Sequence, residues 1–374
     1  MRHGFTTGSC AAAGAKAATY MLLSGRRKEK ISIITPKGIE YIPEIEKIEI
    51  FEKRVKCGVK KDGGDDIDAT HGTYIMSEVS IEETPASNET KVVIDGGYGV
   101  GRVTKPGLDQ PVGNAAINSV PRKMILKEVL EVCKMFDFKG TLKVIISAPE
   151  GEKIAEKTFN PRLGIIGGIS ILGTSGIVEP MSVQALLDTI EVEIKQKKAQ
   201  GYDILALAPG NYGLDFMKDK YNFDLDKSVK CSNFIGETID IAKKVGFDKI
   251  LLTGHIGKLI KVSGGIMNTH SREADSRMEL IEAAAVMETD DITLLRNIMN
   301  VVSTEEAVRL LEQANIKEKV MDRIMNKIVY YLNKRQKDDI QIECIMYSND
   351  FGELAKSKQA IDFLNKIKET ENIL

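Results

Sequence analysis

The sequence lacks the features that mark several broad classes of protein. No apolar run approaches the roughly 18 residues that a membrane-spanning helix requires, and the N-terminal stretch MRHGFTTGSC has no hydrophobic region of a secretory signal. The formal net charge is only −2 over 374 residues, so no global positive field would attract nucleic acid. We therefore expect a soluble cytoplasmic protein that binds neither membranes nor nucleic acid.

Cysteine is scarce as well. The five cysteines are odd in number, scattered and without a CxxC pair, at positions 10, 57, 133, 231 and 344. This pattern argues against a disulfide framework and against a zinc site, and it favours a reducing compartment. We therefore expect no metal site in the protein itself. Cys10 stays open as an alternative nucleophile, because it stands where a predicted helix begins.

The glycine-rich loops lack the spacing of phosphate-binding motifs. In GGYGVGRVTKPGL, residues 96–108, a G-x-G-x-x-G motif would need glycine at position 102, where the chain has Arg102. In GHIGK, residues 254–258, both the four-residue spacer of a P-loop and the following Ser or Thr are absent. The absence of both motifs argues against nucleoside triphosphates as ligands of these loops. The first loop is then a mobile turn that presents Arg102 and Lys105 to carboxylates, with Arg122 in the first turn of the next predicted helix.

Length and pattern predict two domains. A single core usually stops growing at about 250–300 residues, so a chain of 374 residues is expected to divide. Residues 1–181 start with a helix over 9–24 that ends at Gly25, continue with β-rich segments and indicate an α+β domain. Residues 182–374 alternate strands, glycine loops and helices and end in a helical part. That alternation is typical of an α/β Rossmann-like domain with a mostly parallel sheet.

Two regions of the first domain offer candidate substrate ligands. Thr6, Thr7 and Ser9 stand at the start of the first helix, where their hydroxyls either cap free amides or help to bind an anion. The segment 160–180 carries five glycines among apolar residues, which predicts a buried, kinked segment with Arg162 at its mouth. The alternative is a tightly packed strand pair that contacts no ligand.

In the second domain, ligands are expected at the carboxyl ends of the parallel strands. Two predicted strands, 202–208 and 249–253, end there in glycine-containing loops. The candidate residues at these ends are Gly210, Asn211, Gly213, Gly254, His255, Lys258 and Lys261. His270 follows in a further loop. Either histidine is a candidate general base, and a purely structural role is open for both.

Several blocks of the sequence resemble a known family. They are GFTTGSCAAAGAKAA, GGYGVGRVTKPGL, PVGNAAINSVPRKMI, NPRLGIIGGISILGTSGIV, SNFIGETID and GHIGKLIKVSGGIMNTHS. In this order, between residue 4 and about residue 271, they are similar to the signature blocks of the cobalt-precorrin-5B C1-methyltransferase family, the CbiD family of anaerobic cobalamin biosynthesis. The last hundred residues share only their helical character with it.

The resemblance implies an enzyme that transfers a methyl group from S-adenosyl-L-methionine to C1 of cobalt-precorrin-5B and gives cobalt-precorrin-6A. It implies that cobalt arrives with the corrinoid substrate, and that catalysis is mainly alignment in a dry site. The corrinoid carboxylates would then be bound by Thr6, Thr7, Ser9, Arg102, Lys105, Arg122, Arg162, Lys258 and Lys261. S-adenosylmethionine would be bound by Gly210, Asn211, Gly213 and Gly254, with His255 and His270 as the catalytic candidates.

A non-enzymatic reading uses the same basic loops. A corrinoid-binding protein that channels intermediates between enzymes would also need cations for the carboxylates, but the second α/β half would then have no task. For this reason we favour the enzyme. The sequence leaves a homo-oligomer open.

Overall fold

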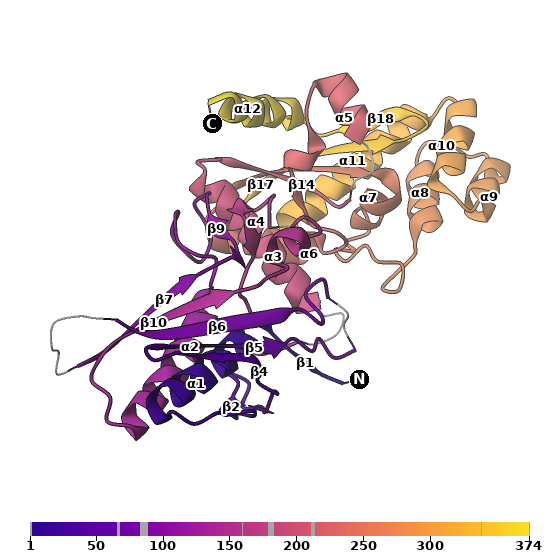
Figure 1. The fold of residues 1–374 in the computed structure, drawn as a ribbon. Coiled ribbons are helices and arrows are strands. Elements are labelled where there is room, and N and C mark those ends of the chain that lie inside the picture. Colours follow the sequence, from indigo (N-terminus) through magenta and orange to yellow (C-terminus); the bar gives the residue numbers. More distant parts are fainter. Residues whose placement is uncertain are drawn as a thin grey trace. The chain divides into compact units, whose positions relative to one another are not determined.

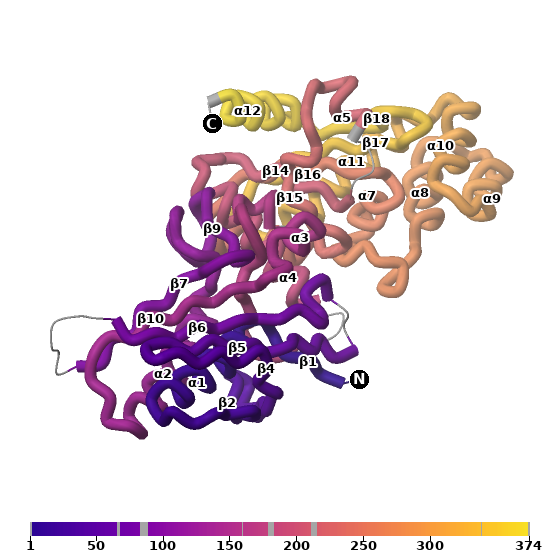
Figure 2. Tube along the Cα trace, viewed as in Figure 1, coloured from indigo at the N-terminus to yellow at the C-terminus, as the bar shows by residue number. Residues whose placement is uncertain are grey.

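The chain divides into two units, Met1–Ser182 and Val183–Leu374, which are described in turn. The computed structural model describes residues 2–65, 68–82, 89–158, 160–178, 183–210, 214–337 and 339–373. Figures 1 and 2 follow the chain through both units. Each unit is a mixture of helices and sheets. No helix within these ranges is long and apolar enough to cross a bilayer.

The first unit is organised around a five-stranded sheet. In spatial order the strands are β4 (Glu46–Ile50), β5 (Arg54–Lys60), β6 (Tyr74–Glu82), β10 (Gly140–Ser147) and β7 (Thr90–Gly96). All neighbours are antiparallel except β10 and β7, which are parallel. Helix α1 (Thr7–Ser24) packs on β5 and β6 and against α2 (Ser119–Met135). Its run of alanines is fully buried, because small side chains allow this close approach.

Short strand pairs complete the first unit. They are β1 (Gly4–Phe5) with β13 (Ile177–Val178), β2 (Ile33–Ile34) with β3 (Glu40–Tyr41), β9 (Arg102–Val103) with β11 (Ile165–Ile166), and β8 (Gly99–Val100) with β12 (Gly168–Ile169). Helix α3 (Gly151–Ala155) lies against β8 and β12. The two glycine-rich segments of the sequence therefore pair with each other. Between residues 160 and 178 the segment forms short strands that pair with residues 99–103, and whether it contacts a ligand stays a prediction.

The second unit contains a second five-stranded sheet. Its spatial order is β15 (Val229–Lys230), β14 (Ile204–Ala208), β16 (Lys249–His255), β17 (Gln341–Ser348) and β18 (Gly352–Lys356). The first four strands are parallel and β18 is antiparallel to β17. The helices are α4 (Val183–Ala199), α5 (Leu214–Tyr221), α6 (Ile235–Val245), α7 (Ile256–Val262), α8 (Arg277–Ala285), α9 (Ile292–Asn300), α10 (Thr304–Gln313), α11 (Lys317–Arg335) and α12 (Ala360–Ile373). A 3₁₀ turn covers Leu225–Lys227.

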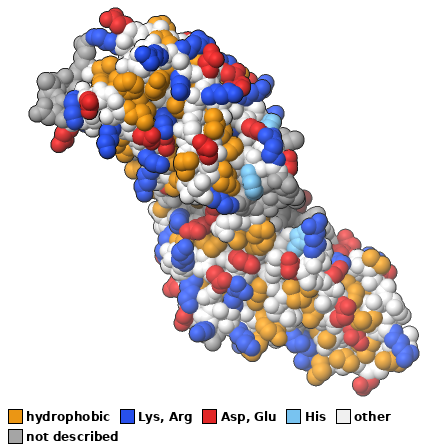
Figure 3. Space-filling model, turned by 90° about the horizontal axis from the view of Figure 1, so that it is seen from below, with side chains coloured by type: hydrophobic (Ala, Val, Ile, Leu, Met, Phe, Trp, Pro, Cys, Tyr) orange, Lys and Arg blue, Asp and Glu red, His pale blue; other side chains and the backbone are white. Residues whose placement is uncertain are grey.

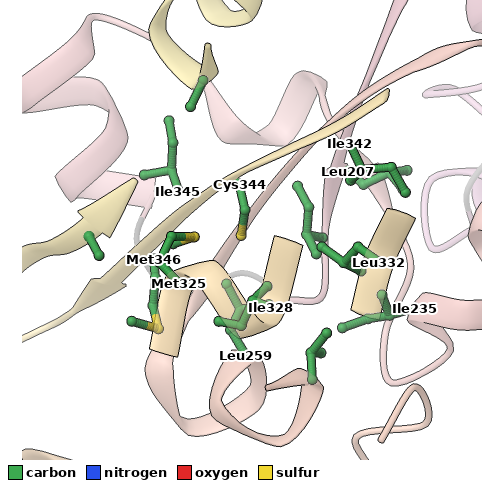
Figure 4. Close-up of a cluster of buried hydrophobic side chains, with 14 of the residues drawn as sticks. Leu207, Ile235, Leu259, Met325, Ile328, Leu332, Ile342, Cys344, Ile345 and Met346 are labelled. Atoms are coloured by element: carbon green, nitrogen blue, oxygen red, sulfur yellow. The ribbon is translucent and has the colours of Figure 1, made fainter. Parts of the chain in front are cut away.

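The core of the second unit lies between this sheet and its helices. Figure 4 shows Cys344 and Met346 of the sheet together with Leu259 of α7 and Ile328 of α11. All four side chains are fully buried. Strands buried in this way need not alternate polar with apolar residues, which explains the continuous apolar run of β14.

The helix predicted over 9–24 is confirmed as α1, and Gly25 ends it in the left-handed conformation at φ 66°. The predicted strands 202–208 and 249–253 are confirmed as β14 and β16. Other predictions were wrong. The turn at 96–108 contains β8 and β9, and the loop expected after Gly254 is the helix α7.

Candidate active site

The hydroxyl groups at the start of α1 bind the glycine-rich segment of the same unit. The Thr6 side chain accepts a hydrogen bond from the Ser9 amide at 3.2 Å, and the Ser9 hydroxyl donates to the Gly176 carbonyl at 2.6 Å. The Thr7 hydroxyl donates to the Leu172 carbonyl at 3.2 Å and accepts from its amide at 3.0 Å. These contacts fasten the helix to the segment. The proposed role of the three hydroxyls toward a substrate stays a prediction.

Cys10 has the surroundings of a structural cysteine. It is fully buried, with its sulfur 3.5 Å from the Tyr41 hydroxyl. Burial raises the pKa of the thiol to about 11, so the thiolate needed for nucleophilic attack is scarce at neutral pH. The alternative of a Cys10 nucleophile therefore finds no support in its environment.

Three of the predicted basic residues come together on a small ladder of the first unit. The ladder consists of residues 113–115, 102–104 and 164–166: Arg102 pairs with both Ala115 and Ile166. Since directly opposed residues point to the same face, Arg102 and the exposed Ile166 lie side by side. Lys105 stands two residues after this strand, and its ammonium group donates to the backbone carbonyl of Arg162 at 3.3 Å. The ladder thus carries Arg102 and Ile166, with Lys105 and the exposed Arg162 beyond its end.

Arg102 already has an acidic partner. Its guanidinium binds both carboxylate oxygens of Asp95, at 2.8 and 3.1 Å, and the Gly96 carbonyl at 2.9 Å. Burial alone would raise the pKa of Asp95, but Arg102 holds that pKa below its usual range. The pair is about half exposed, at 45% for Arg102 and 41% for Asp95. Such a pair contributes little to stability, so a ligand carboxylate could replace Asp95 at small cost.

Arg122 is held in a different way. Its side chain donates to the carbonyls of Ile117 and Ile94, both at 2.8 Å, and of Ala115 at 3.4 Å. Burial lowers the pKa of this guanidinium. Turning toward a ligand would leave the carbonyls without these donors. The two arginines therefore differ in their partners: Arg102 binds a half-exposed carboxylate, whereas Arg122 binds backbone carbonyls. The sequence predicts the same role for both.

Exposed apolar side chains lie near the basic residues of the first unit. Ile166 is 54% exposed, and Tyr98, which precedes β8, is 64% exposed. Figure 3 shows one face of the molecule, on which Lys, Arg, Asp and Glu side chains are interspersed with exposed hydrophobic ones. An exposed apolar side chain beside a cation, as at Ile166 and Arg102, suits a ligand with an apolar body and carboxylates at its rim.

In the second unit, the carboxyl ends of β14 and β16 lie next to each other because the two strands are parallel neighbours. Gly254 is closely packed there: a Cβ atom on it would lie 3.0 Å from the Leu259 side chain and 3.1 Å from that of Pro209. Gly210 follows Pro209 at the same edge. Asn211 and Gly213 lie outside the described residues. The sheet edge that the sequence predicts is therefore present, but side chains of the protein itself fill the space beside Gly254.

His255 ends β16 and caps α7. Its Nδ1 accepts the Gly257 amide proton at 3.1 Å, so Nε2 carries the proton of the neutral ring. Nε2 lies 2.9 Å from a carboxylate oxygen of Glu305, in the first turn of α10. Burial lowers the pKa of His255 even though Glu305 opposes this shift. Both ring nitrogens are engaged, which favours a positioning role over that of a general base.

A polar pocket of about 320 Å³ lies in the second unit, next to the segments that follow β15 and β16. It is lined by Asn233, Gly257, Lys261, Thr269, His270, Ser271, Asp275 and Arg277. The ammonium of Lys261 is buried and donates to the carbonyls of Thr269 and Ala274 at 3.2 and 2.8 Å. His270 is exposed at the pocket, and its Nδ1 accepts from the Arg272 amide at 3.1 Å. Lys261 thus shapes the pocket wall.

Sequence reasoning predicted Lys261 and His270 but missed three charged residues at or near this pocket, which are Asp275, Arg277 and Glu305. Arg277 binds both carboxylate oxygens of Asp275, at 2.6 and 2.9 Å. Glu305 approaches His255 from a helix 50 positions further along the chain. No local motif marks these residues, since each stands among other charged residues in a helix or turn. Only the fold brings them to the strand ends.

Comparisons with known proteins found a matching family and relatives that cover almost the whole chain. The CbiD family matches residues 1–180, and the CbiD C-terminal domain matches residues 268–358. The expectation that the last hundred residues share only helical character with the family is therefore wrong. Cobalt-precorrin-5B C(1)-methyltransferase of Ruminiclostridium cellulolyticum is 47% identical over 349 residues, which are 93% of this chain and 89% of that protein. The protein of the same name from Clostridioides difficile (strain 630) is 42% identical and covers 97% of this chain and 96% of its own length.

A solved structure, a cobalamin biosynthesis protein (CbiD) of Archaeoglobus fulgidus, is 28% identical, with 74% of this chain and 84% of that one covered and a TM-score of 0.39. The family matches include the start of α1, the glycine-rich segments and the lining of the pocket at 269–277. With relatives above 40% identity over nearly its whole length, the chain belongs to the CbiD family.

Proposed function

We propose that the protein is an S-adenosylmethionine-dependent methyltransferase that methylates C1 of cobalt-precorrin-5B to give cobalt-precorrin-6A. The observation that carries this proposal is the 47% identity to a cobalt-precorrin-5B C(1)-methyltransferase over 93% of the chain. Both the exposed basic ladder and the pocket at the strand ends suit it. The reaction is that of a soluble biosynthetic enzyme, which we place in the cytoplasm.

We further propose that the second unit is a Rossmann-like domain that binds S-adenosylmethionine at the carboxyl edge of its sheet. Four parallel neighbours, β15, β14, β16 and β17, support this reading, because ligands of such sheets bind at that edge. The pocket there fits the charged methionine end: Arg277 can pair with its carboxylate and Asp275 with its ammonium group. Gly210 and Gly254, which the sequence predicts to bind the cofactor, do not line this pocket, and Gly254 packs against the Leu259 and Pro209 side chains.

The corrinoid is proposed to bind the first unit at the ladder. Arg102, Lys105 and Arg162 would pair with the acetate and propionate groups, and Ile166 would contact the apolar ring. Arg102 is the best placed of these, since its present partner Asp95 is half exposed. Cobalt comes with the substrate in this proposal. Among the described residues, no group of three or more His, Cys, Asp or Glu side chains is arranged to hold a metal ion.

Catalysis is then a matter of placement. S-adenosylmethionine, when bound, supplies a methyl group on a sulfonium: the methyl–sulfur bond breaks to leave S-adenosylhomocysteine, the macrocycle supplies the electron pair of the new carbon–carbon bond, and one proton passes from the macrocycle to water, as the expected gain of one CH₂ requires. No nucleophile on the protein is required, which agrees with the burial of all five cysteines. The residues of this chain bind, orient and exclude water. His255, engaged at both nitrogens, would hold the start of α7 beside the pocket.

The experiment that tests the proposal is methyl transfer by the purified chain. With cobalt-precorrin-5B and S-adenosylmethionine, we expect one equivalent of S-adenosylhomocysteine for each corrinoid consumed, and a product heavier by one CH₂. A corrinoid that binds tightly but leaves both compounds unchanged would contradict the enzyme and would support the channelling protein instead. Isotopically labelled methyl groups identify C1 as the site by NMR.

Replacing His255 by glutamine should preserve most of the activity. Glutamine keeps a hydrogen-bonding side chain but cannot take a proton, whereas a positioned general base contributes about 10²–10⁴-fold. We expect His255→Gln to retain kcat within about tenfold, with an unchanged pH profile, because Nδ1 and Nε2 are already occupied. The measurement is kcat between pH 5.5 and 8.5.

A matched variant, Glu305→Gln, keeps a partner for Nε2 and serves as the control. If His255→Gln instead loses activity on the scale of a missing base, and an ionisation near the usual His pKa of about 6.5 disappears from the profile, then His255 is the catalytic base.

A further inference from the structure

The ammonium group of Lys258 joins two loops at the carboxyl edge of the second sheet. Lys258 lies in α7, and its Nζ donates to the carbonyl of Pro209, which follows β14. The same Nζ donates to the carbonyl of Ser232, which follows β15, at 3.2 Å. Strands β15, β14 and β16 are adjacent. One side chain therefore fastens the ends of two strands to the helix that follows the third.

The loop held at Ser232 has an unfavourable backbone. Ser232 has a φ of 53°, in the left-handed region where a residue with a side chain is strained. The next residue, Asn233, lines the polar pocket. Its carbonyl accepts the Thr269 amide proton at 2.9 Å, and its side-chain oxygen lies 3.4 Å from the Thr269 hydroxyl. The conformation of Ser232 thus decides how Asn233 enters the pocket.

Lys258 is poorly suited to a second task as a carboxylate ligand. Burial lowers the pKa of its ammonium group, and the two carbonyls already take two of its three donors. Moving Nζ toward a substrate would release both carbonyls and the strained turn. In a P-loop the corresponding lysine binds phosphate, whereas here the lysine of GHIGK binds backbone oxygens.

We propose that Lys258 is a positioning residue for the S-adenosylmethionine site: by binding the carbonyls of Pro209 and Ser232, it holds Ser232 in the left-handed conformation and places Asn233 in the pocket. This inference rests on the proposed function for the identity of the ligand. It replaces the sequence-based expectation that Lys258 binds a corrinoid carboxylate.

The test combines Lys258→Met with Ser232→Gly, because a glycine at position 232 does not need the lysine to hold it in the left-handed conformation. Lys258→Met removes the donors, and we expect it to weaken binding of S-adenosylhomocysteine, measured by calorimetry, about tenfold. The KM for S-adenosylmethionine should rise equally, and the KM for the corrinoid should not change. Ser232→Gly takes the left-handed conformation without strain. The double variant K258M/S232G should therefore regain a large part of the lost affinity.

Rescue by glycine separates the two roles. A lysine that binds a substrate carboxylate would raise the corrinoid KM in K258M, and Ser232→Gly would not restore it; that result overturns the inference. So does unchanged affinity for S-adenosylhomocysteine in K258M. Should K258M fail to fold, the double variant must fold and bind, or the inference falls. Lys244→Met, at a lysine 76% exposed on α6, controls for the lost charge.

Failure of the proposed function looks different. The unsubstituted chain is assayed first, and absence of methyl transfer overturns the function together with this inference. Transfer by the unsubstituted chain with no effect of K258M on the cofactor overturns the inference alone.

Discussion

Replacing Gly99 by alanine is expected to destabilise the first unit severely. A Cβ atom on Gly99 would lie 1.8 Å from the Ala148 carbonyl oxygen, and φ at Gly99 is 73°. The carbonyl cannot easily move, since it accepts the Gly151 amide while the Ala148 amide donates to Tyr98. Backbone strain and overpacking together cost about 2–6 kcal/mol, a large part of a typical domain's stability. Urea denaturation followed by circular dichroism measures the loss.

Gly167→Ala is the matched control. Gly167 also has a positive φ, 82°, but no atom lies within 4 Å of where its Cβ would be. Its substitution should cost only the left-handed penalty, about 1–2 kcal/mol. Equal losses at Gly99 and Gly167 would show that close packing at Gly99 contributes nothing, contrary to the structure.

The glycine-rich segments show how far sequence reasoning reaches. Their composition indicates that something must come close to the backbone, and this is correct. Whether that partner is a ligand or another backbone is not encoded locally. At Gly99 the partners are Ala148, Gly151 and Gly168, from segments about 50 and 70 residues away. The turn predicted as mobile is therefore a tightly packed crossing of the chain.

Elements with strong local signals were predicted well. The first helix follows from its alanines and from Gly25, and the buried strands follow from their apolar runs. Helix α7 was missed because it has only seven residues, and Gly254 before it and Gly257 within it are typical of a loop. Strand β18 gave no signal, because it is short, begins at Gly352 and does not alternate apolar with polar residues. Both form because the sheet supplies the packing surface.

The sequence locates the basic residues of the candidate site but not their partners. Their roles toward a substrate or cofactor stay predictions. Several partners of these residues come from distant parts of the chain: Glu305 for His255, and the carbonyls of Pro209 and Ser232 for Lys258. Asp95, the partner of Arg102, is near in sequence but precedes it in another strand. The sequence alone does not show whether a basic side chain binds a ligand or has a structural role. The structure bears on that distinction through burial and hydrogen-bond partners.

Arg122→Met is expected to lower the stability of the first unit and to leave the affinity for the substrate nearly unchanged. Methionine has a similar length and packs well, but it removes the donors from the carbonyls of Ile117 and Ile94. A buried acceptor left without its partner costs about 1–3 kcal/mol, so two of them predict a loss of about 2–4 kcal/mol, allowing for partial relaxation. Urea denaturation gives the free energy of unfolding. The KM for the corrinoid in the folded fraction should stay within about twofold, which corresponds to about 0.4 kcal/mol, because the Arg122 guanidinium binds backbone carbonyls and not the substrate.

Arg102→Met provides the contrasting case. Its pair with Asp95 is half exposed, and such pairs contribute about 0–1 kcal/mol, so stability should hardly change. A charge-assisted bond to a substrate carboxylate contributes about 1.5–3 kcal/mol, so the corrinoid KM should rise about tenfold or more, and its dependence on salt should become shallower. If the two variants exchange these behaviours, so that Arg122→Met leaves stability intact and raises the corrinoid KM, then the buried guanidinium is the substrate ligand. The carbonyls of Ile117 and Ile94 would then have to find other donors when the corrinoid binds.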